Sequence, residues 1–385
     1  MQPSLDFIAV LLLAGVVQGG FLAVALFTLR RGNRVANRIL GLLLALFAGN
    51  IILHTLAYSQ YLFKFPQLAK IDAPLAFLFA PLFYFYVKAL TKKNFRFEAT
   101  TWLHFIPFLL CAASFVPFYL QSAAEKIRHL REALAGPCVQ CRLVSWLLVI
   151  QMLIYFVAAY KILQRHQENI KAAFSSIEKI NLNWLRYLLG VYAFDWLAVL
   201  AWQLSGGGMA TANYLWLFVS IIMYAIGYKG LQQPEIFAGI DEAAIPEAAA
   251  AKKKYEKSTL TPAKAEAYYQ KLLHVMAAEK PYCQRDLSLP KLAQRLSMST
   301  HHLSQIINER LQQNFFEFVN QYRIEEAKSL LLARANINVA EIGFEAGFSS
   351  VSAFNTAFKK YTGMSPSQFR REAGKTQFQE MATKL

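Results

Sequence analysis

Seven apolar runs, each about 20 residues long, recur through the first 230 or so residues and are separated by short polar loops. A helix of about 20 apolar residues is long enough to cross the roughly 30 Å hydrocarbon core of a bilayer. The runs cover about 5–29, 39–60, 73–91, 102–121, 143–163, 184–204 and 212–230. The pattern predicts an all-α chain in which residues 1–231 form a polytopic bundle of about seven membrane-spanning helices.

The distribution of Lys and Arg predicts the orientation of these helices, because cationic loops are retained on the cytoplasmic side. The loops after the first, third and fifth runs carry twelve such residues: Arg30, Arg31, Arg34, Arg38, Lys88, Lys92, Lys93, Arg96, Lys161, Arg165, Lys171 and Lys179. The opposite loops carry six: Lys64, Lys70, Lys126, Arg128, Arg131 and Arg142. We therefore expect a multi-pass protein of the bacterial inner (cytoplasmic) membrane, with its N-terminus outside and its C-terminus in the cytoplasm.

The first run has one alternative interpretation, a cleaved signal peptide. It lacks a basic segment before its apolar core, and Arg30 and Arg31 follow it as in a stop-transfer sequence. A retained span is the preferred prediction.

Residues 263–372 contain two helix-turn-helix patterns in tandem. The first, about 288–311, has Pro290 in the first turn of a helix and small Ala293 where a second helix must pack closely. Ser297–Ser299 makes the turn, and Ser299 or Thr300 can cap the second helix. With Leu303, Ile306 and Ile307 in the core, the outer face of that helix carries His301, His302, Ser304, Gln305 and Asn308.

The second pattern, about 338–361, follows a long amphipathic helix and repeats the first. Gly343 stands where Ala293 stood, and Gly347 lies where the turn needs a positive φ or a close approach. Ser350 can cap the helix 351–360, whose exposed positions are Val351, Ser352, Asn355, Thr356 and Lys359. Pro366 then begins a last short helix that carries Arg370 and Arg371.

These residues closely resemble the AraC-type (AraC/XylS) transcription regulators over about 100 positions. The carrying motifs are Tyr322-Arg323-Ile324 with Ala327 and Leu330, then Gly347-Phe348-Ser349-Ser350, Phe358-Lys359-Lys360, and Ser365-Pro366 with Phe369-Arg370. The resemblance implies a cytoplasmic domain of about seven helices whose two recognition helices enter successive major-groove segments of double-stranded DNA. The apolar half is similar, in layout only, to regulators that fuse a seven-span sensor-like region to an AraC-type domain.

The resemblance assigns roles to side chains by position. The base-facing set is His301, Ser304, Gln305, Val351, Ser352 and Thr356, and the phosphate-facing set is Lys359, Lys360, Arg370 and Arg371. No Arg lies on either exposed recognition face, so the bidentate guanine contact is missing and DNA shape is expected to contribute. Two alternatives stay open: His301 and His302 as plain solvated surface, and Ser350 as a cap without DNA contact, which is preferred for Ser350.

Residues 232–262 form a linker between the halves, and residues 373–385 a tail. Pro234, Pro246 and Pro262 flank an Ala-rich stretch with the cluster Lys252–Lys254. That cluster is interpreted as solvated or adhering to anionic headgroups, in preference to a specific DNA contact.

Polar residues within the apolar runs are costly in lipid and are therefore candidates for sensing a small-molecule or envelope signal. Asp195, His54, Asn50 and His104 are the main candidates, and Gln18, Gln151 and Asn213 are further polar positions. The competing interpretation is interhelical hydrogen bonding that only holds the bundle together. For Asp195, a partner such as His54, His104 or Lys88 is expected.

Cysteine spacing adds one hypothesis. Cys138 and Cys141 form a CxxC pair in the longest outer loop, where an oxidising exterior favours a disulfide. A structural disulfide is preferred over a redox or metal-responsive switch and over free thiols. No metal site is predicted, because a fourth ligand is missing.

The sequence lacks a phosphate loop, a zincin pair, a nucleophile elbow and a kinase set, so we expect neither an enzyme nor a cofactor. The leading hypothesis is a membrane-anchored one-component transcription regulator that binds DNA sequence-specifically. The rival is a membrane transport or receptor protein with a regulatory cytoplasmic tail. A homodimer fits either, without a heptad seam to prove it. The signal, the target promoters, activation or repression, and proteolytic release are left open.

Overall fold

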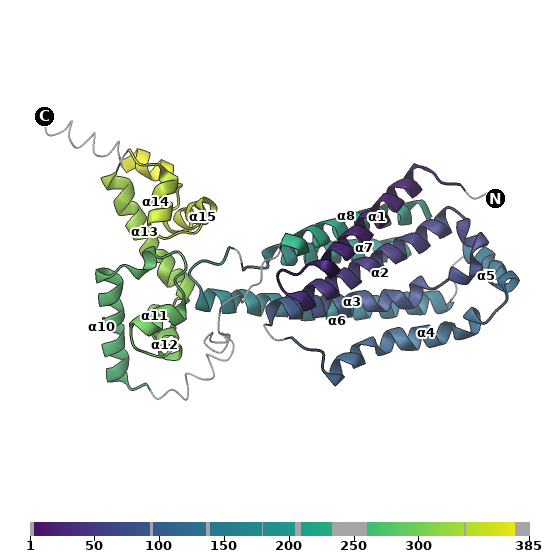
Figure 1. Ribbon diagram of the computed structural model, residues 1–385, viewed down its shortest axis with the longest axis horizontal. Coiled ribbons are helices and arrows are strands. Elements are labelled where there is room, and N and C mark those ends of the chain that lie inside the picture. The colour runs from purple at the N-terminus through teal and green to yellow at the C-terminus, as the bar shows by residue number, and fades with distance from the viewer. Residues whose placement is uncertain are drawn as a thin grey trace. The chain divides into compact units, whose positions relative to one another are not determined.

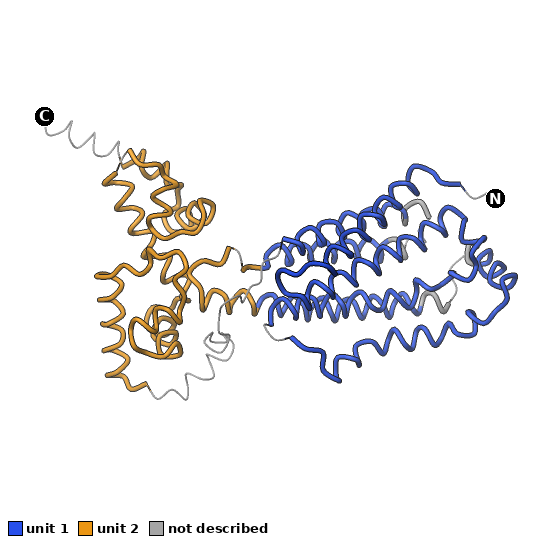
Figure 2. The backbone as a smooth tube through the Cα atoms, viewed as in Figure 1, with its two compact units in different colours: residues 1–164, 182–236 blue, residues 165–181, 237–385 orange. Residues whose placement is uncertain are grey.

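The computed structural model describes residues 4–92, 95–135, 139–178, 180–204, 209–232, 260–334 and 336–373. Within these residues every regular element is a helix, and the β pairing is a single isolated bridge, so the prediction of an all-α chain is confirmed (Figure 1). The chain divides into two compact units, Met1–Gln164 with Leu182–Ile236, and Arg165–Asn181 with Phe237–Leu385 (Figure 2).

The N-terminal unit is a bundle of long apolar helices. Its elements are α1 (Phe7–Thr28), α2 (Arg34–Tyr58), η1 (Tyr61–Lys64), η2 (Pro66–Leu68), α3 (Asp72–Thr91), η3 (Ala99–Phe105), α4 (Ile106–Tyr119), α5 (Ala123–Ala135), α6 (Val139–Ala173), α7 (Asn183–Leu204) and α8 (Met209–Gln232). Seven helical stretches of the described chain, η3 joined with α4 counting as one, are long and apolar enough to cross a membrane. This finding concerns length and composition.

Local chemistry explains where the first helices begin and how closely they pack. Asp6 and Asn33 cap α1 and α2 by accepting from the backbone N–H groups of Ala9 (2.8 Å) and Ala36 (3.1 Å). The helix α1 packs against α2 and α8. A Cβ added to Gly227 of α8 would lie 2.7 Å from Leu22 Cδ1, so the absence of a side chain allows the close approach.

Two elements of this part of the chain differ from the sequence prediction. The predicted loop after residue 121 contains α5, whose Lys126 is buried and donates to the carbonyl of Tyr119 (2.8 Å) and to Gln67. The helix α6 is longer than the apolar run 143–163, because it continues through polar residues to Ala173.

The C-terminal unit contains α10 (Pro262–Ala278), η5 (Pro281–Cys283), α11 (Leu289–Arg295), α12 (Thr300–Leu311), α13 (Phe315–Ala333), α14 (Val339–Glu345), α15 (Val351–Thr362) and a last helix over residues 366–373. It has two separate apolar cores. One joins α10, α11 and α12 to Phe315, Phe318 and Val319 of α13, and the other joins α14 and α15 to Ile324, Ala327 and Leu331 of the same helix. The helix α13 thus supports one helix-turn-helix on each half of its length.

Candidate DNA-binding surface

The first helix-turn-helix consists of α11 and α12, joined by a tight turn. The N–H of Met298 donates to the carbonyl of Ala293 (3.0 Å), and Ser297 adopts a left-handed φ of 52°. Ser299 caps α12 by accepting from the N–H of His302 (3.1 Å). Leu303, Ile306 and Ile307 are buried in the first core, as the periodicity predicts.

The second helix-turn-helix, α14 and α15, repeats this turn fifty residues later. The N–H of Phe348 donates to the carbonyl of Gly343 (3.0 Å), and Gly347 has a φ of 98°. A Cβ on Gly347 would lie 2.3 Å from the carbonyl oxygen of Tyr282, so both expected reasons for glycine hold here. Gly343 is constrained by space alone, since a Cβ there would lie 2.6 Å from Cδ1 of the Phe354 side chain.

The helix α15 is strongly amphipathic and presents the predicted reading face to solvent. Phe354 and Phe358 are fully buried in the second core. Val351, Ser352, Asn355, Thr356 and Lys359 are exposed. Ser350 accepts from the N–H of Ala353 (3.1 Å), so it caps the helix as predicted. That it makes no DNA contact stays a prediction.

The reading face of α12 differs from the prediction at two positions. Ser304 and Gln305 were expected on the outer face, but they are only 5% and 7% exposed. Gln305 Nε2 donates to the Glu309 carboxylate (3.2 Å), and Asn308 Nδ2 donates to Ser304 Oγ (3.3 Å). In this conformation the two side chains are engaged within α12 itself, so reading bases with them requires that they become accessible. His301 is half-buried.

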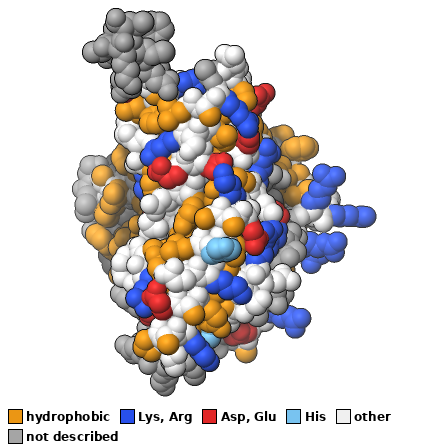
Figure 3. Space-filling view, turned by 90° about the vertical axis from the view of Figure 1, so that its left-hand side faces the viewer, with side chains coloured by type: hydrophobic (Ala, Val, Ile, Leu, Met, Phe, Trp, Pro, Cys, Tyr) orange, Lys and Arg blue, Asp and Glu red, His pale blue; other side chains and the backbone are white. Residues whose placement is uncertain are grey.

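The predicted phosphate-facing residues lie at the C-terminal end of α15 and on the last helix. Lys359 and Lys360 are exposed, and Lys360 Nζ lies 3.4 Å from Glu317 Oε1 on α13. Arg371 is exposed and Arg370 half-buried. Over the middle of the face drawn in Figure 3, basic side chains lie among acidic and apolar ones, and several more basic side chains gather at its right-hand edge.

Arg323 is the functional residue to which the sequence analysis assigned no role. It lies on α13 between the two cores and has no exposed surface. Its Nε donates to the carbonyl of Tyr282 (2.7 Å) and its Nη2 to that of Gln284 (2.9 Å). Desolvation lowers the pKa of Arg323 to about 10, so it stays charged at neutral pH. The sequence did contain a signal for this role, because Arg323 is a cationic residue within the apolar stripe of a helix.

In the N-terminal unit, the polar residues mostly bond between helices. His54 Nε2 of α2 lies 2.9 Å from Asn213 Oδ1 of α8, and His104 Nδ1 lies 2.6 Å from the Tyr155 hydroxyl of α6. Gln151 Nε2 donates to the carbonyl of Phe77 (3.1 Å). These contacts match the interpretation of polar groups that hold the bundle together.

Asp195 and Asn50 differ from these residues. Both are 3% exposed, and among the described residues Asp195 Oδ1 and Asn50 Nδ2 have no hydrogen-bond partner. The partner expected for Asp195 is not found: His54 and His104 bond elsewhere, and the ammonium of Lys88 lies over the rings of Tyr84 and Phe95. Sensing by Asp195, Asn50, His54 and His104 stays a prediction.

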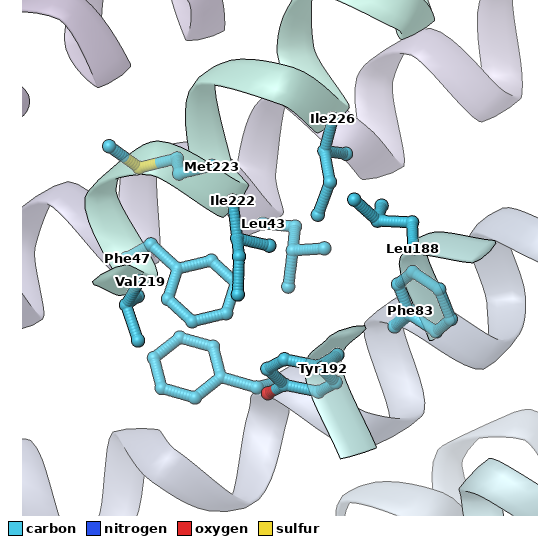
Figure 4. Close-up of a pocket in the computed structure, with 10 residues that line it drawn as sticks. Leu43, Phe47, Phe83, Leu188, Tyr192, Val219, Ile222, Met223 and Ile226 are labelled. Carbon is cyan, nitrogen blue, oxygen red and sulfur yellow. The ribbon is translucent and has the colours of Figure 1, made fainter. Parts of the chain in front are cut away.

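A small apolar pocket lies between α2, α3, α7 and α8 (Figure 4). Its lining consists of aliphatic and aromatic side chains, with the Tyr192 hydroxyl as the polar group: Leu43, Phe47, Phe79, Phe83, Leu188, Tyr192, Val219, Ile222, Met223 and Ile226. The lining offers no charged group that would identify a ligand.

The cysteine hypothesis falls outside what is described, because Cys138 and the side chain of Cys141 are not among the described residues. The linker residues 233–259 and the tail residues 374–385 are likewise outside them. The described cysteines, Cys111 and Cys283, are free thiols. No group of three or more His, Cys, Asp or Glu side chains that could hold a metal ion occurs among the described residues.

Two capped recognition helices on one supporting helix define a helix-turn-helix DNA-binding domain. A family model described as a helix-turn-helix domain matches residues 292–372. The chain is 35% identical over 80 residues to the transcriptional regulatory protein YesN of Bacillus subtilis, covering 20% of this chain and 22% of that protein. It is 35% identical over 86 residues to the Msm operon regulatory protein of Streptococcus mutans, covering 22% of this chain and 31% of that protein.

Among solved structures, the C-terminal domain of AraT, a response regulator from Geobacillus stearothermophilus, is 33% identical, with a TM-score of 0.25. The match covers 30% of this chain and 88% of that one. The chain thus spans less than a third of the lengths of the two curated relatives above, and the shared part is the DNA-binding region. Its C-terminal part is that of a DNA-binding transcription regulator, a non-enzymatic class.

Proposed function

We propose that this chain is a membrane-anchored, one-component transcription regulator of the AraC type. The N-terminal helices span the inner membrane with the N-terminus outside, and the C-terminal unit reads DNA in the cytoplasm. A signal at the apolar helices, a small molecule or an envelope condition, shifts the population of DNA-binding states.

One combination of features carries this proposal. The described part of the chain has seven helical stretches of membrane-spanning length and a capped, amphipathic α15 whose exposed face includes Val351, Ser352, Thr356 and Lys359. Hydroxyl groups of Ser and Thr both donate and accept hydrogen bonds with base edges, the Val351 side chain suits a thymine methyl group, and lysine suits phosphate. An anchored reader is the simplest function that uses both halves.

The test is chromatin immunoprecipitation of the intact protein in its bacterial host. A Ser352→Ala/Thr356→Ala double variant is compared with Ser329→Ala, which removes an exposed hydroxyl of α13. Membrane fractionation confirms equal levels. We expect discrete genomic peaks for the wild type and for Ser329→Ala, and their loss in the double variant.

Peaks that survive the double variant would refute α15 as the reading helix. An absence of peaks from the membrane-bound wild type in every growth condition would favour the transport or receptor alternative.

A further inference from the structure

The segment between α6 and α7 is bound to the DNA-binding domain. Residues 165–181, the last turns of α6 and the segment that follows it, belong to the C-terminal compact unit, although the rest of α6 and all of α7 belong to the N-terminal one (Figure 2). We call residues 174–178 the docking segment. Phe174 forms an antiparallel bridge with Ser288, the residue before α11. A polar loop is thereby paired with the backbone that leads into the first helix-turn-helix.

Hydrogen bonds from the two residues that follow Phe174 extend the pairing. The N–H and the Oγ of Ser175 both donate to the carbonyl of Leu287, at 3.3 and 2.6 Å. Ser176 Oγ donates to the carbonyl of Arg285 (2.9 Å). Ser175 is 1% exposed, so these protein hydrogen bonds replace the ones that its polar groups would make with water. The contact is a specific, buried interface.

The docking segment also completes the hydrogen bonding of Arg323. Nη1 of Arg323 donates to the carbonyl of Ser175 (3.0 Å), and Nη2 donates to Ser175 Oγ (2.9 Å). This guanidinium also donates to the carbonyls of Tyr282 and Gln284 and, at longer range, to Ser176 Oγ (3.4 Å) and Asn320 Oδ1 (3.5 Å). Arg323 lies at the point of α13 where one apolar core ends and the other begins. The segment is therefore bound at the junction of the two helix-turn-helix units.

Glu178 connects the segment to the second unit. Ser349 Oγ donates to Glu178 Oε2 (2.8 Å), and Ser349 directly precedes Ser350, the cap of α15. The N-terminal residues of a recognition helix are those that meet base edges, and they enter a groove flanked by phosphates. A carboxylate at this position repels the DNA backbone and stands at the entrance of the reading helix.

We propose that the docking segment is an autoinhibitory latch on the DNA-binding domain. Docked, it holds the two helix-turn-helix units in one arrangement and places the negative charge of Glu178 where DNA approaches. When the segment is released, the two helix-turn-helix units can rearrange and the charge of Glu178 no longer opposes DNA. Because α6 and α7 flank the segment in the sequence, a rearrangement of these helices shifts the docked population. This inference rests on the proposed function, and it names the regulation of that site.

The first test changes the charge alone. Full-length protein in lipid nanodiscs is titrated with a DNA site recovered by the immunoprecipitation above. The variant Glu178→Gln is compared with Glu168→Gln, which neutralises an exposed carboxylate of α6 in the same connecting region. We expect Glu178→Gln to bind about five-fold more tightly, the effect of one like-charge contact at the surface. Glu168→Gln should match the wild type.

The second test locks the segment reversibly. Directly opposite residues of an antiparallel pair have Cα atoms about 4.5–5.5 Å apart, within the range that a disulfide requires. Phe174→Cys/Ser288→Cys is made in a background without the four natural cysteines, and each single replacement serves as its control. We expect the oxidised double variant to bind DNA at least ten-fold more weakly than the same protein after reduction.

The outcomes separate this proposal from the proposed function. Failure of the disulfide to form would refute the docking. The latch would be refuted if the oxidised protein bound DNA as tightly as the reduced protein or more tightly, or if Glu178→Gln had the affinity of the wild type. The proposed function would still hold in that case if Thr356→Ala abolished sequence-specific binding. If neither wild type, reduced variant nor Glu178→Gln binds any DNA sequence-specifically, the proposed function itself fails and the latch with it.

Discussion

At the residue scale, Gly347 is constrained by its conformation and by its surroundings. It combines a φ of 98° with the backbone of Tyr282 and Cys283 lying 2.3–2.9 Å from where a Cβ would be. Gly363 has a similar φ of 80° but open space around it. Substitutions at these two glycines therefore separate the free-energy cost of a left-handed conformation from that of a steric clash.

We expect Gly347→Ala to destabilise the C-terminal unit by about 3 kcal/mol or more, because the backbone of η5 must move as well. Gly363→Ala should cost about 1 kcal/mol. The measurement is pulse proteolysis of the full-length protein in urea, followed through a C-terminal tag. Tryptophan fluorescence would not serve, since all six tryptophans lie at or before residue 216. Equal losses in the two variants would contradict the steric argument.

Arg323 shows the same dependence on distant backbone. Its planar guanidinium reaches the carbonyls of Tyr282, Gln284 and Ser175 at once. A lysine ammonium cannot reproduce that fork.

We therefore expect both Arg323→Lys and Arg323→Met to lower the unfolding free energy by about 3 kcal/mol, through unsatisfied carbonyls and lost charge-assisted bonds. The same proteolysis assay measures this loss of unfolding free energy. Lys328→Met is the control, because Lys328 is half-buried on α13 and its ion-pair partner Glu325 is exposed. A wild-type midpoint for Arg323→Lys would show that a single positive charge is sufficient.

At the element scale, α15 separates the two kinds of DNA contact along one helix. Its first turns expose Val351, Ser352 and Thr356, and its last turn exposes Lys359. Base edges are read near the N-terminus of such a helix, and lysine neutralises phosphate without reading sequence.

Lys359→Ala should reduce the slope of log affinity against log salt by about 1 and weaken binding equally on all sequences. Thr356→Ala should instead change the preferred sequence and leave the slope intact. Titrations at several salt concentrations, with DNA selected from a random pool, test both. A changed sequence preference in Lys359→Ala would place that residue on the bases.

At the scale of the whole molecule, the predicted topology places most loop Lys and Arg residues on the cytoplasmic side of the membrane. Twelve basic residues lie after the first, third and fifth apolar runs or in the last turn of these runs, against six in the opposite loops.

We expect a fluorescent protein fused at the C-terminus to be bright in the cytoplasm. In a cysteine-free background, Ser122→Cys, next to α5, should react with an impermeant maleimide in intact cells. Gly32→Cys, between α1 and α2, should react only after the membrane is permeabilised. The reverse labelling pattern would invert the orientation and remove the DNA-binding unit from the DNA.

The sequence by itself determined the helices and most turns, because their causes are local. Apolar runs 5–29 and 184–204 became α1 (Phe7–Thr28) and α7 (Asn183–Leu204), and the caps Ser299 and Ser350 were readable because a cap bonds within three residues. The reason for Gly347 was also readable, since the two turns repeat at a fixed spacing.

Only the tertiary structure decided what each polar side chain meets. Arg323 donates to carbonyls about 40 and 150 residues away in sequence, and Ser175 donates to the carbonyl of Leu287, over 100 residues away. The burial of Ser304 and Gln305, the lack of a described hydrogen-bond partner for Asp195 Oδ1 and the docking of residues 174–178 likewise depend on the tertiary structure. A periodic pattern shows which face of a helix is apolar, but a single polar group finds its partner only when segments remote in sequence are brought together.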